Sequence, residues 1–338
     1  MAASSRIGQA NTSKKVRILG ICILLVIGIY TGGWYFVADQ ARSRLMAALD
    51  RSQGAAISAE CPDAEIRGFP FRFGLFCSGV SIDDNRRGIS ASFGALRSAA
   101  QVYDPFHVVF EVDEPVVVRA APGLTFSAEW TALQSSAQLA TDGVERTSLA
   151  VDGLKTNLVS ALAGELLNLN ASHGELHLRR NGPDLDAAAS LLAVSGTVEG
   201  RNRPLPPVTV DVDVTMAEKA ALLQGAGKDA ANLRGAKGEL RTLSADLGEG
   251  RTLQISGPFS FNDEGYVSGK LKLEIAGIEG WRQTLKTAFP EAAKNIDTAG
   301  NMLTALVSGG NQVSVDLTLR DGDIMISGFI KVGEIPPI

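Results

Sequence analysis

The chain has 338 residues, of which 45% are hydrophobic, and its formal net charge is −5. All 37 acidic residues lie after residue 38, together with 28 basic residues, so that residues 39–338 carry a formal net charge of −9. A domain that is acidic overall and lacks a basic run is a poor binder of nucleic acid. Its length is sufficient for a large core or for two subdomains.

One uncharged segment near the N-terminus, from Ile18 to Ala38, can cross a bilayer. About 20 apolar residues are enough for a transmembrane helix, and no second segment of this kind follows in residues 39–338. We therefore predict a cytoplasmic tail (1–17), a transmembrane anchor (18–38) and an exported domain (39–338). The residues that mark the anchor are apolar or aromatic: Ile18, Leu24, Leu25, Val26, Trp34, Tyr35 and Phe36.

The charges beside the anchor predict its orientation. Four basic side chains precede it, namely Arg6, Lys14, Lys15 and Arg17, and the positive-inside rule then places the N-terminus in the cytoplasm. A cleaved signal peptide is the alternative, although its apolar region would be shorter, at about 7–15 residues. Both interpretations export the rest of the chain. A short helical stalk with Leu45, Met46 and Leu49 on one side is expected after the anchor.

Two of the three cysteines, Cys61 and Cys77, lie 16 positions apart in the exported domain. Disulfides persist in oxidising compartments such as the bacterial periplasm, and we predict one between these two residues. Two unpaired buried cysteines are the alternative. A zinc site is disfavoured because neither a Cys-x-x-Cys motif nor paired histidines lie nearby.

Four phenylalanines lie between these cysteines, in the segment from Arg67 to Cys77. If this segment is extended, Phe69, Phe71 and Phe73 share one face of a strand. Two interpretations are open. The crowding favours an aromatic core nucleus held by the disulfide, and the alternative is an apolar surface that binds lipid or a partner.

Alternation of apolar and polar residues dominates the rest of the exported domain. The clearest strand has four valines on one face: Val208, Val210, Val212 and Val214. Three hairpins are predicted where turn residues separate two alternating runs. Their turns lie at residues 181–184, 262–265 and 321–323, and the last alternating run extends from Ile324 to Val332.

Helical periodicity is confined to a few segments. An apolar stripe runs from Trp281 to Leu306, and Pro290 is expected to divide it into a short helix and a longer one. Shorter helices are predicted at Met216–Leu223 and, from leucines spaced by four, at Leu154–Leu166. The fold class is mainly β (α+β): a transmembrane helix and then an elongated antiparallel sheet or groove domain with one or two packed amphipathic helices.

No arrangement of residues is typical of an active site. His173 and His177 are four residues apart in a predicted strand, which separates them by roughly 13 Å, too far to share one metal ion. The segment 225–228 (Gly-Ala-Gly-Lys) resembles a phosphate-binding loop but lacks its first glycine and its Ser or Thr. We predict no enzyme, no catalytic residue, no metal site and no cofactor.

The anchor, the stalk, the motif Gly-Phe-Pro-Phe-Arg at 68–72 and the C-terminal segment 333–338 together resemble a family of uncharacterised bacterial envelope proteins with a single membrane pass, a domain-of-unknown-function family. The pattern is also remotely similar to the AsmA-like envelope proteins. Those proteins are β-rich and anchored in the inner membrane, and their larger members form long grooves implicated in phospholipid traffic. The resemblance implies a periplasmic β-groove domain, with the N-terminus in the cytoplasm.

The expected function is therefore that of an inner-membrane-anchored periplasmic protein that binds lipid or another amphipathic ligand in an apolar β-groove, with a role in envelope maintenance. Candidate ligand-binding residues are limited to Phe69, Phe71 and Phe73. The alternative is a non-enzymatic structural or interaction subunit of an envelope assembly, with a closed core. The expected partners are membrane lipid and other envelope proteins, and nucleic acid is not expected.

Overall fold

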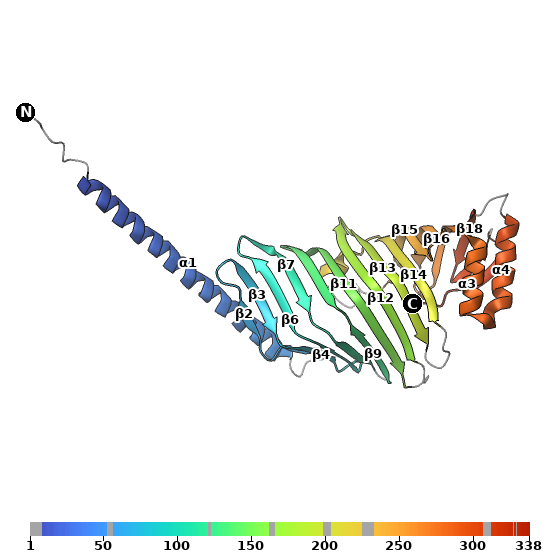
Figure 1. Cartoon of the computed structure of the whole chain (residues 1–338), viewed down its shortest axis with the longest axis horizontal. Helices are drawn as coiled ribbons and strands as arrows, with labels where there is room; N and C mark the ends of the chain where they lie inside the picture. The colour runs from blue at the N-terminus through green and yellow to red at the C-terminus, as the bar shows by residue number, and fades with distance from the viewer. Residues whose placement is uncertain are drawn as a thin grey trace, which may run out of the picture.

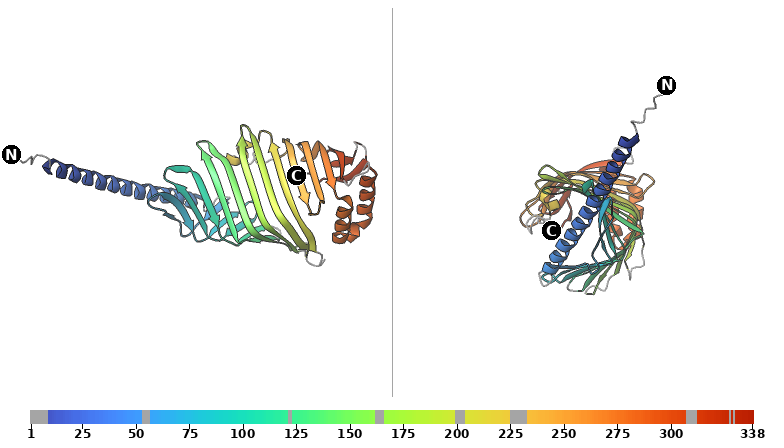
Figure 2. Two further views of the ribbon diagram at one scale, coloured as in Figure 1. Left: turned by 45° about the horizontal axis from the view of Figure 1, so that its top comes forward. Right: turned by 90° about the vertical axis from the view of Figure 1, so that its left-hand side faces the viewer.

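The computed structural model describes residues 9–52, 57–120, 123–161, 166–198, 204–224, 233–306, 312–326, 328 and 330–338. A long helix, α1 (Gln9–Ser52), leads into one elongated antiparallel sheet, and two helices pack at its far end (Figure 1). The view along the long axis shows that the sheet is curled (Figure 2). The predicted mainly β fold with an N-terminal apolar helix is confirmed.

The N-terminal part of the sheet consists of five long strands that are each interrupted once. Both halves of each interrupted strand pair antiparallel with the corresponding halves of the next. The halves are β1 (Ile57–Glu60) and β2 (Glu65–Arg67), β3 (Arg72–Cys77) and β4 (Val80–Asp84), β5 (Ile89–Phe93) and β6 (Leu96–Gln101), β7 (Asp104–Val112) and β8 (Val116–Ala120), and β9 (Leu124–Glu129) and β10 (Ala132–Ala140).

Ten further strands continue the sheet as a meander, in which each strand pairs antiparallel with the next. The first of them, β11, joins the two parts because one half pairs with β10 and the other half with β9. These strands are β11 (Gly143–Ser160), β12 (Leu166–Asn181), β13 (Asp184–Val198), β14 (Pro204–Met216), β15 (Lys237–Asp246), β16 (Thr252–Phe261), β17 (Val267–Ala276), β18 (Gln312–Arg320), β19 (Asp323–Ile326) and β20 (Ile330–Glu334).

The interruptions of the first five strands line up across the sheet, and we call this line the crease. They fall at residues 61–64, 78–79, 94–95, 113–115 and 130–131. Hydrogen bonds continue across it: the Gly94 N–H donates to the Asp113 carbonyl (3.1 Å), and the Asp113 N–H donates to the Ala95 carbonyl (2.8 Å). The buried Trp130 donates its indole N–H to the Val112 carbonyl (3.0 Å). The strands are therefore interrupted at the crease while these backbone groups keep their partners.

The helices between β17 and β18 follow the predicted stripe. α3 (Ile278–Ala288) and α4 (Ala293–Leu306) are separated by a short 3-10 turn, η2 (Pro290–Ala292). Trp281 of α3 and Leu303 of α4 pack against the buried residues Ile275 and Val313 of the sheet. The prediction of two amphipathic helices divided at Pro290 is confirmed.

The strand and hairpin predictions are also confirmed in the main. The valine strand is β14, and the three predicted turns join β12 to β13, β16 to β17 and β18 to β19. The last alternating run is not one strand, however. β19 ends at Ile326, the chain turns at Gly328 with φ 79°, and β20 then pairs back onto β19.

Two shorter helix predictions are wrong. Leu154 and Leu158 belong to β11, and Leu166 begins β12; residues 162–165 lie outside the described part. A spacing of four fits a strand face as well as a helix face, and pairing with β9 and β12 on both sides selects the strand. At Met216–Leu223 the chain forms the end of β14 and a 3-10 segment, η1 (Ala220–Gln224).

Candidate functional site

One face of the sheet is apolar over eight consecutive strands. Two rows of directly paired residues, from β11 to β18, define this apolar face. The first row is Leu149, Leu176, Ala189, Val212, Leu243, Ile255, Leu273 and Val315, and the second is Val151, Gly174, Leu191, Val210, Ala245, Leu253, Ile275 and Val313. At a strand spacing of about 4.8 Å, each row is about 34 Å long.

The opposite face is polar in the same register. The row between the two apolar rows is Ala150, Glu175, Ser190, Asp211, Ser244, Gln254, Glu274 and Ser314. Its members bond to one another: the Ser190 hydroxyl donates to Asp211 (2.7 Å), and the Ser244 hydroxyl donates to the same carboxylate (3.2 Å). The side chains therefore sort into one apolar and one solvated face, as strand alternation requires.

Helices pack on the sheet at both of its ends. At the N-terminal end, Trp34 of α1 stacks on Phe73 of β3, with ring centroids 5.1 Å apart. At the other end, α3 and α4 cover the strands around β17 and β18. Along one edge, Leu222 and Leu223 of η1 pack near Leu178.

Between these helices, part of the apolar face is exposed, while Leu149 and Val151 at its β11 end pack against the buried Trp130. Leu176 of β12 and Leu191 of β13 have 39% and 37% of their surface exposed, although both lie on the apolar face. Their neighbours Leu149 and Ala189 are half-buried. We call these four side chains the central window. Exposed leucines within a continuous apolar surface differ from a finished core, in which such side chains are buried.

A shallow hollow of about 590 Å³ lies on the polar face, and its lining includes Arg97, Glu111, Glu175 and His177. His173 and His177 lie on β12, as the predicted strand requires, and both rings contact Glu175 at 3.1 and 3.0 Å. Hydrogen bonds to Asp152 and to Glu175 raise the pKa of His173, and bonds to the two histidines lower the pKa of Glu175. Over the described part of the chain, no three His, Cys, Asp or Glu side chains are arranged to hold a metal ion.

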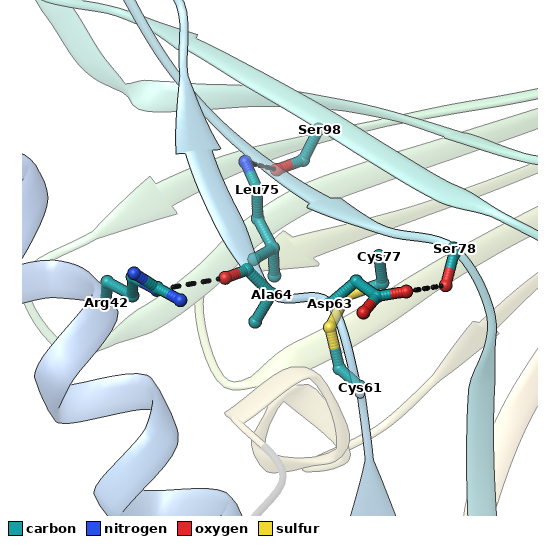
Figure 3. Close-up of a disulfide and its surroundings, with 8 residues drawn as sticks. All are labelled: Arg42, Cys61, Asp63, Ala64, Leu75, Cys77, Ser78 and Ser98. Atoms are coloured by element: carbon teal, nitrogen blue, oxygen red, sulfur yellow. Dashed lines mark hydrogen bonds between the residues drawn. A yellow bond between two sulfur atoms is a disulfide. The ribbon is translucent and has the colours of Figure 1, made fainter.

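The predicted disulfide between Cys61 and Cys77 is present, with a Cα–Cα distance of 5.5 Å. Both cysteines are buried at the crease, next to Ala64 (Figure 3). Arg42 of α1 donates from Nε to the Ala64 carbonyl at 3.1 Å, so that the helix is attached directly to this cluster. The expected apolar side of the stalk also packs here, through Leu45, Met46 and Leu49.

The expectation that three phenylalanines share a strand face is wrong. Phe69 and Phe71 lie in the turn between β2 and β3, and only Phe73 belongs to β3. Gly68, with φ 118°, and Pro70, which has no N–H group, end the extended conformation there. Phe69 and Phe71 are exposed, so the interpretation as an aromatic core nucleus does not apply to them.

The predicted anchor residues lie along α1, which is the described helix long and apolar enough to cross a membrane. Most of them are exposed: Ile18, Leu24, Leu25, Val26, Tyr35 and Phe36. Trp34 is the exception, because it is buried against the first strands. Most of the predicted anchor is therefore exposed, whereas its part at Trp34 is packed against the sheet.

The residues of the central window were not singled out from the sequence. Alternation puts Leu176 on an apolar strand face, and the same pattern holds for strands that helices cover. Which stretch stays open depends on where α1 and α3 dock, and those helices are distant from β12 in the sequence. The alternation of apolar and polar residues does not distinguish a strand face that helices cover from one that stays exposed.

A model of the protein family described as "Uncharacterized protein conserved in bacteria (DUF2125)" matches residues 34–336. The match begins at Trp34, where α1 docks on the sheet, and includes the whole sheet with α3 and α4. No curated protein and no solved structure matches the chain. The expected remote similarity to AsmA-like proteins stays a prediction.

Proposed function

The chain belongs to the DUF2125 family of uncharacterised bacterial proteins, and from the geometry of its sheet we propose that it binds lipid or another amphipathic ligand along the apolar face. The central window is the observation that carries this proposal. Leu176 and Leu191 are exposed within two apolar rows that α3 and α4 cover at the β17–β18 end. An apolar chain laid across them would remove both leucines from water, and each buried methylene contributes about 0.8 kcal/mol.

The setting of the protein supports a membrane lipid as the ligand. α1 anchors the sheet beside a bilayer, in our proposal the bacterial inner membrane, with the sheet in the periplasm and a role in envelope maintenance. The basic N-terminal tail supports this orientation. The disulfide between Cys61 and Cys77 supports an oxidising compartment.

Two adjacent residues of β13 provide a matched test. Leu191 lies on the apolar face opposite Gly174, whereas Leu192 lies opposite His173 on the polar face, and the two are exposed to 37% and 39%. We expect Leu191→Glu to reduce bound phospholipid about tenfold or more, because a carboxylate resists burial against an acyl chain. Leu192→Glu should bind as the wild type does.

The measurement is native mass spectrometry of the full chain after gentle detergent extraction, combined with uptake of a fluorescent phosphatidylethanolamine. Lipid that surrounds α1 is common to both variants and cancels in the comparison. Equal binding by both variants, or a wild-type protein that carries and takes up no lipid, would contradict the proposal. That result would support the alternative of a structural or interaction subunit with a closed core.

A further inference from the structure

The apolar anchor and the β-sheet overlap along α1. The 21 residues from Ile18 to Ala38 form a helix about 30 Å long, which matches the thickness of a bilayer core. The sheet already contacts α1 at Tyr30, whose hydroxyl donates to the Pro70 carbonyl. If the sheet stayed outside the apolar layer, only Ile18–Ile29 would cross it, and that segment is about 18 Å long. A crossing by all 21 residues would therefore place the turn between β2 and β3, which contains Pro70, at membrane depth.

Aromatic contacts fix the turn between β2 and β3 at that depth. The indole N–H of Trp34 donates to the Arg72 carbonyl at 3.1 Å. The ring of Phe69 packs against Trp34 and Tyr35, with centroid distances of 5.5 and 5.6 Å. In Figure 1, α1 runs alongside β2 and β3. Because helix and turn are joined at several points, their relative depth does not depend on one flexible side chain.

A second turn lies beside the first one and also ends in an aromatic residue. The Val102 N–H, between β6 and β7, donates to the Phe71 carbonyl at 2.9 Å. Phe71 is 66% exposed and Tyr103 is 77% exposed, the largest exposed fraction among the large hydrophobic side chains described. We call Trp34, Tyr35, Phe69, Phe71 and Tyr103 the aromatic collar. Aromatic side chains of this kind are enriched where a membrane meets water.

Four carbonyl groups in and beside the first turn are paired within the protein. The carbonyl groups of Gly68, Pro70, Phe71 and Arg72 accept hydrogen bonds, from Arg72 N–H, Tyr30, Val102 and Trp34 respectively. Pro70 has no N–H to satisfy. Non-helical backbone is tolerated at membrane depth when its polar groups are paired within the protein.

Charged side chains flank the turns of the collar, and Arg67 and Glu65 form an exposed ion pair directly before the first turn. Arg72 is exposed at the start of β3, where its long side chain can reach lipid phosphate while its stem stays apolar. Asp104 carries the acidic charge of the second turn and lies 4.0 Å from His107. This distribution fits the headgroup level of a bilayer.

We propose that the aromatic collar is inserted into the lipid leaflet on the sheet's side of the membrane that α1 crosses. The turns β2–β3 and β6–β7 then lie among the headgroups and the first acyl carbons. Phe73, stacked on Trp34, lies on the same side of the sheet as the apolar face, to which it is linked by the paired residues Ala100, Val108, Ala137, Thr147 and Leu178. The inference rests on α1 crossing a membrane, as in the proposed function, and is independent of lipid binding at the central window.

Photo-crosslinking of the full chain tests this arrangement. The photoreactive residue p-benzoylphenylalanine would replace Phe71 or Tyr103, both of which are exposed, so that folding is preserved. The protein would be irradiated in nanodiscs made of equal parts of POPE and POPG, and adducts identified by mass spectrometry. We expect phospholipid adducts at both positions. Phe289, at the end of α3 and 40% exposed, is the matched control and should give no lipid adduct.

A fourth position, Leu191 in the central window, separates the two proposals. Lipid adducts at 71 and 103 but none at 191 would support the collar and count against the lipid-binding window. Adducts at 191 with none at 71 and 103 would overturn the collar while the proposed function stands. Adducts at 71 or 103 to protein in place of lipid would also overturn it, because they would show that another chain covers these turns.

Discussion

At the scale of single residues, Asp186 is the one charged side chain that is buried in the described part of the chain, at 6% exposure. It lies on the polar face and accepts hydrogen bonds from Arg179 Nη2 (2.6 Å), Thr215 Oγ1 (2.8 Å) and Arg241 Nη1 (3.3 Å). These partners, Arg179 foremost, lower the pKa of Asp186 from 3.8 to about 2. The network ties together β12, β13, β14 and β15 behind the central window.

This network gives the protein an acid-sensitive contribution to stability. Because the folded-state pKa is lower than the unfolded one, the contribution is complete above pH 4 and is lost as the pH falls from about 4 to about 2. We expect Asp186→Asn to lower the free energy of unfolding by about 1–2 kcal/mol at pH 7, after allowance for the exposed guanidinium groups. The difference from the wild type should shrink below pH 4.

Denaturant unfolding of the detergent-solubilised chain, followed by tryptophan fluorescence across this pH range, measures the effect. Asp213→Asn is the control, since Asp213 pairs with the same Arg241 but is much less buried than Asp186, with a side chain 42% exposed. A loss that is the same at pH 3 and pH 7 would contradict the assignment of the network to the ionised carboxylate.

At the scale of elements, the crease depends on close backbone approach between interrupted strands. A Cβ atom at Gly94 would lie 2.4 Å from the Asp113 carbonyl oxygen, whereas at Gly79, in the preceding interruption, the nearest atom would be 3.7 Å away. Both glycines lie at the crease and neither has a positive φ. A comparison of substitutions at the two positions therefore distinguishes the cost of close packing from the general cost of replacing a glycine.

We expect Gly94→Ala to lower the free energy of unfolding by about 1–3 kcal/mol, because backbone has to move to admit the methyl group. Gly79→Ala should be within about 0.5 kcal/mol of the wild type. Thermal unfolding of the two variants in the same detergent, followed by circular dichroism, distinguishes them. Equal stability of the two variants would show that the crease can relax around an added side chain.

The elements differ in how much of them could be predicted from the sequence. The valines of β14 and the stripe of α3 and α4 are local patterns with one period, and both predictions are confirmed. The segment Leu154–Leu166 has a spacing that fits two structures, and only pairing with β9 decided between them. The turn at Phe69–Phe71 could have been recognised from the preceding Gly68 and the enclosed Pro70, which disfavour a continuous strand.

At the scale of the whole molecule, the sheet extends away from the apolar helix α1 (Figure 1). The described part of the chain forms fifteen strand positions, counting each interrupted strand once, and these span at most about 70 Å at 4.8 Å per strand. On the same scale, the central window at β11–β13 is about 25–35 Å from the first strand. A lipid bound there would have left the bilayer completely, so the apolar rows would have to replace the whole environment of its acyl chains.

The orientation of α1 decides which membrane surface supplies that lipid, and it gives the last prediction. Lys14, Lys15 and Arg17 should hold the N-terminus in the cytoplasm, so alkaline phosphatase fused after Ile338 should be active, and a β-galactosidase fusion at the same position inactive. Replacing these three residues by Gln should lower the phosphatase activity, because Arg42 and Arg44 then carry the larger positive charge on the other flank. A control that replaces Arg86 and Arg87 by Gln, in the turn between β4 and β5, should leave the reporter unchanged. If the unmodified phosphatase fusion is inactive and the galactosidase fusion is active, the topology is the reverse of the predicted one. The disulfide would then lie in a reducing compartment, where it would not persist.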